Sequence, residues 1–372
     1  MGTSPIRQCA DLGCSIWYDN LHRTILNGDL LAMIDRDGLR GMTSNPSIFE
    51  KSIGHSTDYD DQIARLDKSL DDVAAFEALA IRDIQGACDQ FLPVFAQTKG
   101  ADGFVSLEVS PRLARDGKGT VIEARRLYAA VNRPNVMIKV PGSPECIPAI
   151  ETLIGEGINI NTTLLFAVSA YLDTANAYIA GLEHFKAAGG DLSKVAGVAS
   201  FFLSRIDTAV DKLVDEKHAD GKLKGKAAVA NAKVAYSEYE KLIASPRWKA
   251  LAGARPQRLL WASTGTKNPA YPKLMYVETL IGKDTVNTVP TETYNELRDH
   301  GEGHVKLSIT DDLAGAKASL AALEAAGISL KAVTDQLLAD GVAAFGKSFD
   351  TLLPAVAAQR KALAKHSEGA HS

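Results

Sequence analysis

Short apolar runs alternate with longer helical patterns along most of the chain, and this alternation constrains the fold more than any other feature. Strands that alternate with helices form βαβ units and a parallel sheet. Eight such strands predict a single closed (β/α)8 barrel of the TIM type, an α/β fold, with an open doubly wound sheet as the alternative. The predicted strands are Ser15–Asp19, Leu39–Thr43, Gly103–Val109, Val136–Val140, Ile158–Thr163, Val195–Phe202, Leu259–Ser263 and Thr285–Thr288.

Amphipathic stretches between these runs predict the helices of the barrel. They are Leu70–Phe95, Val121–Val131, Ala167–Ala188 and Thr208–Ile243, and the polar run Lys217–Lys226 is interpreted as a solvated helix face.

The last part of the chain has a different pattern. It is rich in Ala and Leu, and its two helical patterns are broken at Gly327, with Asp311 and Asp312 at the expected start. We expect residues 310–366 to form C-terminal helices packed on the barrel, so that residues 1–372 make up one domain.

Composition and charge exclude several classes of protein. The chain has 372 residues and a formal net charge of −4, and without a basic surplus small-molecule chemistry is favoured over nucleic acid. It has no apolar signal segment, no long uncharged span for a bilayer, and four cysteines without disulfide or zinc spacing. We therefore expect a cytoplasmic protein with reduced cysteines, no membrane partner and no metal. The sequence does not decide the oligomeric state, and a homo-oligomer is possible.

A lysine inside an apolar strand is the strongest chemical signal. Lys139 interrupts the run Val136–Val140, which a Pro-Gly pair then ends. A lysine rarely enters a core without a partner or a purpose, and burial favours the neutral amine that a nucleophile requires. Such an amine attacks a carbonyl to give a Schiff base, whose imine accepts electrons while a neighbouring C–C bond breaks.

Alternation along three neighbouring strands gives this lysine its neighbours. Successive side chains of a strand point to opposite faces, which puts Glu108, Lys139, Asn161 and Thr163 on the same side. All four lie late in their strands, where the active sites of barrels are found. The alternative is a buried structural ion pair of Glu108 with Lys139, but such a pair seldom adds stability. Four converging polar groups favour a functional site.

Two further segments end the first and second strands. Asp19 is a candidate to move protons, although it is equally a candidate to cap the helix expected near Leu21. Thr43 and Asn45 lie where the second strand ends and a helix begins, and free backbone N–H groups there attract polar oxygens. The alternative for this second segment is a plain turn with a helix cap.

The ends of the sixth and seventh strands suggest a phosphate site. Arg205 follows Ser200 in the run that ends the sixth strand, and an arginine beside hydroxyls suits a phosphate. Lys267, after the seventh strand, offers a second cation. Barrels of this type favour the loops after the last strands for phosphate, whereas the alternative for Arg205 is an ordinary surface arginine.

Taken together, these segments resemble the transaldolases, class I Schiff-base enzymes of the pentose phosphate pathway. The resemblance spans nearly the whole chain, and Trp261–Pro269 is similar to the longer bacterial subgroup. The motifs that carry it are Trp17–Asn20, Gly41–Phe49, Ser106–Pro111, Ile138–Pro141, Gly157–Phe166 and Ser200–Phe202.

The resemblance implies a transferase that needs no cofactor. It implies transfer of a dihydroxyacetone unit from sedoheptulose 7-phosphate to glyceraldehyde 3-phosphate, which gives erythrose 4-phosphate and fructose 6-phosphate. Lys139 would form the Schiff base, and Glu108 would act through a water. Asp19 would be the acid and base at the substrate C4 hydroxyl, and Thr163 would position the catalytic water.

The same resemblance implies the residues that hold the substrate. Asn45 and Asn161 would bind sugar hydroxyls, and Ser200 with Arg205 would grip the phosphate. Shorter members of the family carry a second arginine after the seventh strand, where Lys267 would stand in for it here.

The resemblance also implies a C-terminal helix that closes near the site. Phe345 and Phe349 would lie on it, although the favoured interpretation is that both are ordinary core aromatics.

Two alternative functions stay open. One is an aldolase that releases free dihydroxyacetone, like a fructose-6-phosphate aldolase, and Gln in place of Glu108 would favour it. A non-catalytic sugar-phosphate-binding protein is the other, and loss of Lys139 or Asp19 would favour that.

Overall fold

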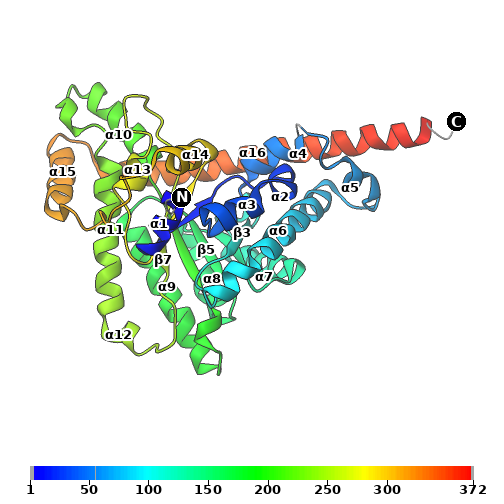
Figure 1. Cartoon of the computed structure of the whole chain (residues 1–372), viewed down its shortest axis with the longest axis horizontal. Coiled ribbons are helices and arrows are strands. Elements are labelled where there is room, and N and C mark those ends of the chain that lie inside the picture. Colours follow the sequence, from blue (N-terminus) through cyan, green and yellow to red (C-terminus); the bar gives the residue numbers. More distant parts are fainter. Residues whose placement is uncertain (1–3, 55, 370–372) are drawn as a thin grey trace.

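The computed structural model describes residues 4–54 and 56–369 and contains a closed barrel of eight parallel strands (Figure 1). The strands follow one another around the barrel in chain order, and the last pairs with the first. The predicted barrel is confirmed and the open doubly wound sheet is wrong, with strand ends shifted by at most two residues. The strands are β1 (Cys14–Tyr18), β2 (Gly41–Thr43), β3 (Phe104–Glu108), β4 (Val136–Pro141), β5 (Ile160–Leu165), β6 (Gly197–Phe202), β7 (Arg258–Ala262) and β8 (Thr285–Val289).

Helices surround the barrel and cover the ends of its strands. They are α1 (Pro5–Asp11), α2 (Arg23–Asn27), α3 (Leu30–Ala32), α4 (Pro46–Gly54), α5 (Asp60–Arg65), α6 (Asp72–Gln97), α7 (Gly117–Val131), α8 (Ile147–Gly155), α9 (Val168–Ala187), α10 (Ser204–Glu216), α11 (Ala227–Ala244), α12 (Pro246–Lys249), α13 (Met275–Glu278), α14 (Thr291–His300), α15 (Leu313–Ala325) and α16 (Leu330–Gly369). A π-helical turn lies at Met33–Asp37. Turns of 3-10 helix lie at Pro111–Leu113, Pro144–Cys146, Leu192–Lys194 and Gly221–Leu223.

One predicted helix is wrong. The stretch Thr208–Ile243 was expected to be continuous, with Lys217–Lys226 as a solvated face, but it forms α10 and α11 with a connection between them. The Asp220 side chain accepts a hydrogen bond from the Lys222 N–H and so stabilises a turn. Gly225 follows with φ of +67°, a conformation that ends a helical path.

Polar side chains at the amino-terminal end of the barrel form a buried network. Asp102, just before β3, accepts hydrogen bonds from Ser15 Oγ at 2.5 Å and from Trp17 Nε1 at 3.1 Å. Arg258, at the start of β7, donates to Ser15 Oγ at 2.6 Å and lies 3.2 Å from the Asp102 carboxylate. Because this end of such barrels carries stability rather than chemistry, we assign the network to holding the strands together.

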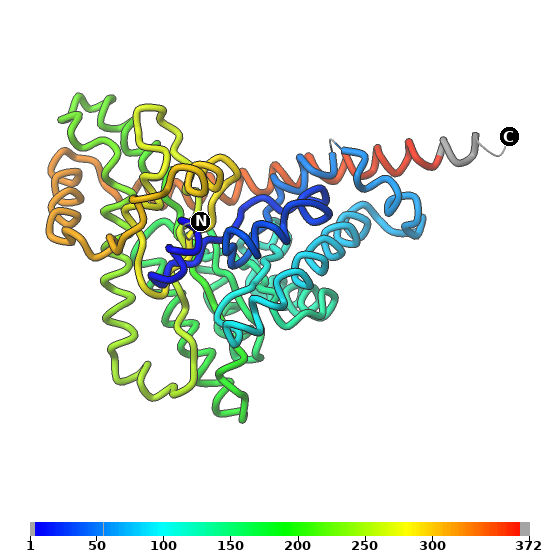
Figure 2. The backbone as a smooth tube through the Cα atoms, in the orientation of Figure 1, coloured from blue at the N-terminus to red at the C-terminus, as the bar shows by residue number. Residues whose placement is uncertain are grey.

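The C-terminal helices begin and break as predicted. Asp312 caps α15 by accepting from the Gly315 N–H at 2.9 Å, and Gly327, with φ of +73°, separates α15 from α16. The long helix α16 runs beside α4 and past α5 (Figure 2). Ser348 on α16 bonds to Ser47 on α4 at 2.8 Å, so α16 is fixed to the helix that follows β2.

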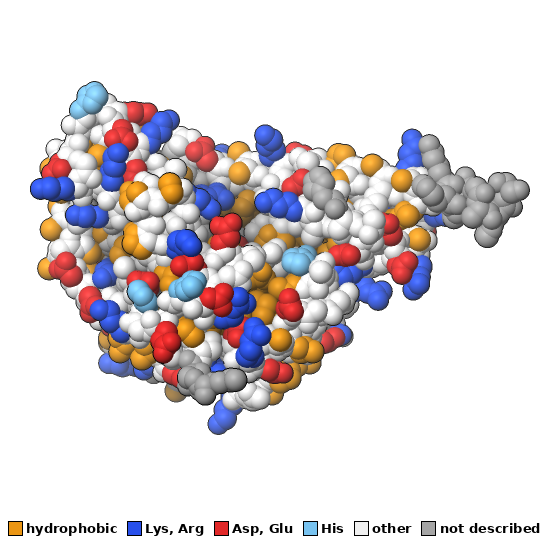
Figure 3. Space-filling model, turned by 45° about the horizontal axis from the view of Figure 1, so that its top comes forward, with side chains coloured by type: hydrophobic (Ala, Val, Ile, Leu, Met, Phe, Trp, Pro, Cys, Tyr) orange, Lys and Arg blue, Asp and Glu red, His pale blue; other side chains and the backbone are white. Residues whose placement is uncertain are grey.

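Within the described chain, no single helix is long and apolar enough to cross a membrane. α15 together with Leu330–Ala364 of α16 has the length and composition of a span, but the two are bent by 89°. Acidic and basic side chains are interspersed over the face of the molecule seen in Figure 3.

Candidate active site

Lys139 lies buried on β4 beside two acceptors. Its Nζ is 3.4 Å from Glu108 Oε2 and donates to the Ser44 carbonyl oxygen at 3.0 Å, and both charged side chains are only 6% exposed. The strand register pairs Glu108 with Lys139 and Lys139 with Asn161, so these residues lie side by side across β3, β4 and β5. Burial raises the pKa of the Glu108 carboxyl, and the positive charge of Lys139 offsets only part of that rise.

Asn161 is held from both sides by hydroxyl groups. Ser200 Oγ donates to Asn161 Oδ1 at 2.6 Å, and Asn161 Nδ2 donates to Ser106 Oγ at 3.0 Å. All three residues are buried. A grip on phosphate by Ser200 would require its hydroxyl to turn away from Asn161, because a hydroxyl has one proton to donate.

Asp19, just after β1, accepts a hydrogen bond from Thr43 and does not cap a helix. Its Oδ1 accepts from Thr43 Oγ1 at 2.6 Å, and Thr43 Oγ1 also lies 2.7 Å from Thr288 Oγ1 at the end of β8. The cap of α2 is His22 instead, whose Nδ1 accepts from the Ile25 N–H at 3.3 Å. Burial raises the pKa of Asp19, while the charge of Lys139 and the Thr43 hydrogen bond lower it by less.

Two buried oxygens in this region lack a hydrogen-bond partner among the described residues. They are Glu108 Oε2, which has only its ion pair with Lys139, and Thr163 Oγ1 on β5. Buried polar atoms are normally satisfied, so these two mark a place for a water or a substrate hydroxyl.

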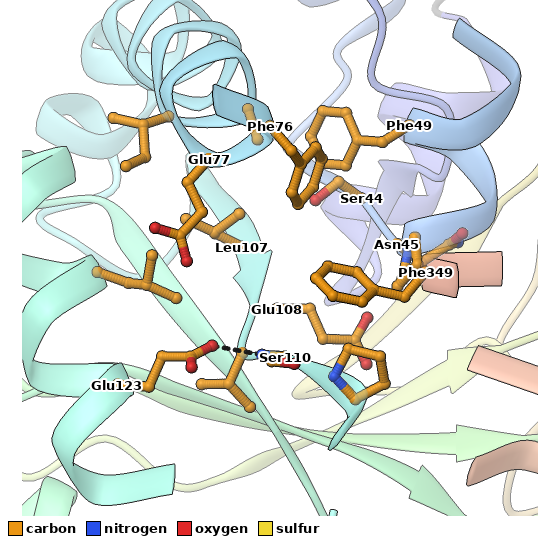
Figure 4. Close-up of a pocket in the computed structure, with 16 residues that line it drawn as sticks. Ser44, Asn45, Phe49, Phe76, Glu77, Leu107, Glu108, Ser110, Glu123 and Phe349 are labelled. Carbon is orange, nitrogen blue, oxygen red and sulfur yellow. Dashed lines mark hydrogen bonds between the residues drawn. The ribbon is translucent and has the colours of Figure 1, made fainter. Parts of the chain in front are cut away.

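A small cavity beside Glu108 is lined by the aromatic rings of Phe49, Phe76 and Phe349. It has a volume of about 30 Å³, enough for a water molecule, and Figure 4 shows the Phe349 ring beside Asn45 and the Glu108 carboxylate. Phe349 packs edge-on against Phe76 with ring centroids 5.8 Å apart. Phe349 on α16 is therefore a core aromatic that also lines the site, whereas Phe345 is buried in the apolar core.

Asn45 caps α4 and also lines a hollow of the molecule. Its Oδ1 accepts from the Ile48 N–H at 3.0 Å, which caps α4, and its side chain also lines a hollow of about 540 Å³ together with Asp19. Lys51 and Thr291 lie on the wall of the same hollow.

Arg205, in the first turn of α10, is a half-buried cation without a counter-ion. Its guanidinium forms no ion pair or hydrogen bond with any residue the structure describes, and it lies 5.3 Å from the centroid of the Phe202 ring. Burial lowers its pKa. On the other side α16 passes close by, since a Cβ added to Gly341 would lie 3.5 Å from Arg205 Nη1. An unpaired cation in this setting suits an anionic ligand.

Lys267 is exposed in the irregular segment after β7. The start of that segment is fixed to α10, because Ser263 Oγ and Ser204 Oγ lie 2.8 Å apart.

Comparison with known proteins assigns the family. The protein-family model described as transaldolase/fructose-6-phosphate aldolase matches residues 16–356 of the chain. The chain belongs to the transaldolase/fructose-6-phosphate aldolase family. It is 48% identical over 369 residues to a transaldolase of Trichodesmium erythraeum, covering 95% of this chain and 97% of that protein. It is 50% identical over 348 residues to a transaldolase of Thiobacillus denitrificans, covering 92% and 96%. A Nostoc protein named transaldolase 2 is 44% identical over 380 residues, covering 98% and 99%.

Membership of this family confirms the resemblance inferred from the sequence motifs. The relatives are enzymes, and this chain is therefore an enzyme of the same family.

Three residues that lie among the candidate site residues had no role predicted from the sequence. Ser106 shares its strand face with Glu108, so alternation could have found it, and Thr288 ends a strand as the other site residues do. The Ser44 carbonyl oxygen gave no sequence signal because every residue carries one. No group of three or more His, Cys, Asp or Glu side chains in the described chain could hold a metal ion.

Proposed function

We propose that this chain is a transaldolase of the pentose phosphate pathway that works through a Schiff base on Lys139. It transfers a dihydroxyacetone unit from sedoheptulose 7-phosphate to glyceraldehyde 3-phosphate, which gives erythrose 4-phosphate and fructose 6-phosphate. Relatives named transaldolase align with it over nearly its whole length and support the proposal. The observation that carries the mechanism is the buried Lys139 amine 3.4 Å from Glu108, with Asn161 beside it.

The reaction begins at the lysine. The Lys139 amine attacks the C2 carbonyl of the ketose, and the carbinolamine then loses water to give a protonated imine. Glu108 moves protons through a water during this loss and during the later return of water. Thr163 positions that water, a role that suits its buried hydroxyl without a described partner.

Carbon–carbon cleavage follows at the opposite side of the site. Asp19 takes the proton from the C4 hydroxyl, the C3–C4 bond breaks, and its electron pair moves into the imine to give an enamine. The aldose phosphate leaves, the acceptor aldehyde enters, and the enamine attacks it while Asp19 returns its proton. Burial raises the pKa of Asp19, which makes its carboxylate a stronger base toward the C4 hydroxyl than an exposed aspartate would be.

The remaining polar residues hold the sugar and its phosphate. Asn45 and Asn161 bind sugar hydroxyls, together with Thr43, which also orients Asp19. Arg205 grips the phosphate, helped by Lys267 as the second cation, and Ser200 keeps the Asn161 amide oriented.

We also propose that residues 1–372 form one domain, with residues 310–366 as helices that complete it, and that the chain works in the cytoplasm. Cys9, Cys14, Cys88 and Cys146 are all free and buried, which suits a reducing compartment.

The requirement for an acceptor tests the transferase activity. With fructose 6-phosphate as donor, we expect release of glyceraldehyde 3-phosphate, measured in a coupled assay, to depend on added erythrose 4-phosphate. Lys139→Met should abolish turnover, and the exposed-lysine control Lys241→Met should leave it unchanged. Turnover that proceeds equally without acceptor would instead support the second candidate, an aldolase that releases free dihydroxyacetone. The presence of Glu rather than Gln at position 108 disfavours that candidate.

A further inference from the structure

The proposed phosphate site includes Lys267, which lies in an irregular segment, so other contacts must hold that segment in position. Arg205 lies on a regular helix, α10, whereas Lys267 lies between β7 and α13, where the chain has no helix or strand of its own. A segment with an exposed lysine contributes more to binding when its position is fixed before the ligand arrives, because less conformational entropy is then lost on binding.

Two carboxylates of α10 hold this segment and the helix α13 that ends it. Asp207 and Asp211 are four residues apart and therefore lie on one face of the helix. Asp207 Oδ2 accepts from the Tyr276 hydroxyl at 2.7 Å, and Asp211 Oδ2 accepts from the Tyr271 hydroxyl. Tyr271 follows Lys267 by four residues, so the bond lies close along the chain to the lysine.

The other oxygens of the same two carboxylates hold the start of α11. Asp207 Oδ1 accepts from the Ala228 N–H at 2.8 Å, and Asp211 Oδ1 accepts from the Gly225 N–H at 2.9 Å. The Tyr271 ring lies directly against Gly225, since a Cβ there would fall 2.7 Å from a ring carbon. All four carboxylate oxygens thus accept hydrogen bonds, so both side chains are fixed in position.

The near end of the segment is attached to the first turn of α10. Besides the contact between their hydroxyls, the Ser204 N–H donates to the Ser263 carbonyl oxygen at 3.1 Å. Ser263 precedes Lys267 by four residues, so the lysine is held on both sides by bonds to the helix that carries Arg205.

We infer that Asp207, Asp211, Tyr271 and Tyr276 are positioning residues that hold the Lys267 segment against Arg205, so that two cations bind the phosphate monoester of the sugar substrate. This inference rests on the proposed function and extends it to the residues that set the preference for phosphorylated substrates. None of the four needs to touch the substrate, because each acts through the position of Lys267.

Removing one hydroxyl tests the inference. For Tyr271→Phe we expect kcat/KM for glyceraldehyde 3-phosphate to fall roughly tenfold, the effect of one lost hydrogen bond to a charged group. The value for unphosphorylated glyceraldehyde should stay unchanged, and the inhibition constant of inorganic phosphate should rise by a similar factor. Tyr239→Phe is the matched control, since Tyr239 donates to the Asp284 carboxylate at 3.2 Å just before β8, at the other end of the barrel.

A double-mutant cycle separates positioning from general stability. Lys267→Met should cause the same selective loss, and adding Tyr271→Phe to it should cause little further loss, because both act on one contact. Tyr276→Phe, expected to act in the same direction, replaces Tyr271→Phe if that variant does not fold. Equal losses for both aldehydes, a loss no larger than in Tyr239→Phe, or fully additive losses would each overturn the inference.

Failure of the inference is distinguishable from failure of the proposed function. If wild-type enzyme forms no borohydride-trapped adduct on Lys139, the proposed function is refuted, and the selectivity for phosphorylated substrates no longer tests the positioning role. If trapping is intact in every variant but the selectivity for phosphate does not change, only the positioning role is lost.

Discussion

Replacing Asp19 by asparagine separates proton transfer from imine formation in the proposed reaction. Asparagine keeps an oxygen that can accept the 2.6 Å hydrogen bond from Thr43, so the side chain stays in place. It cannot take the proton of the C4 hydroxyl. The loss should therefore equal the contribution of a general base, about 10²–10⁴-fold in kcat, or about 2.7–5.5 kcal/mol of barrier.

The same substitution should not destabilise the protein. Because burial raises the pKa of Asp19 above its ordinary value of 3.8, the folded state holds this proton more tightly than the unfolded state does. The carboxyl therefore favours folding most at low pH, and this contribution is lost as the pH rises through the folded-state pKa. An uncharged asparagine avoids that loss, so Asp19→Asn should melt at the same or a higher temperature than wild type at pH 7.

Three measurements on one protein sample check this prediction: kcat in the coupled assay, borohydride trapping with fructose 6-phosphate, and the melting temperature. We expect slow turnover, intact trapping on Lys139, and an unchanged or raised melting temperature. The control is Asp83→Asn, a buried carboxylate of α6 that pairs with Arg23 at 2.7 Å outside the site. It should lower the melting temperature and leave kcat near wild type. A kcat for Asp19→Asn within tenfold of wild type would refute the reasoning, and so would loss of trapping.

Three further predictions concern neighbouring parts of the structure. Ser200→Ala should cost about 1–3 kcal/mol in urea unfolding and lower kcat, because it leaves Asn161 Oδ1 buried without its donor; unchanged values would contradict that role. Asp102→Asn should lower the melting temperature by weakening its contact with Arg258, while kcat stays at the wild-type value, and a parallel fall in kcat would show that the network also serves the site. Burial raises the pKa of Asp207 from 3.8 to about 6, so its ionisation should remove about 3 kcal/mol of stability as the pH rises through that range. Urea unfolding at several pH values should show a steeper fall of stability over that range in wild type than in Asp207→Asn, and equal slopes would contradict it.

The grouping of Glu108, Lys139 and Asn161 could be predicted from the sequence because it depends on local rules. Strand alternation fixes which side chains share a face, and the parallel register of β3, β4 and β5 then brings Glu108, Lys139 and Asn161 together. The barrel itself followed from the repeat of apolar runs, since a parallel strand is buried on both faces.

Contacts between distant segments could not be predicted in this way. Ser200 was expected to bind phosphate, and only the packing of β6 against β5 reveals that its hydroxyl meets Asn161. The break between α10 and α11 was missed because helical periodicity continues on both sides of Gly225, whose backbone conformation is not visible in a pattern of apolar residues.

The aromatic and tyrosine contacts were hidden for the same reason. Phe349 lines the same cavity as Glu108 only because a helix from the end of the chain packs beside α4. The Tyr271 hydroxyl donates a hydrogen bond to Asp211, which lies 60 residues away in the sequence, and no local sequence pattern indicates that contact.

Borohydride trapping tests the central claim most directly. Wild-type protein incubated with fructose 6-phosphate and reduced with borohydride should gain the mass of one reduced dihydroxyacetone adduct, and peptide mapping should place it on Lys139. Lys139→Met should gain none under the same conditions. An adduct on another lysine, or full turnover without any adduct, would contradict the account.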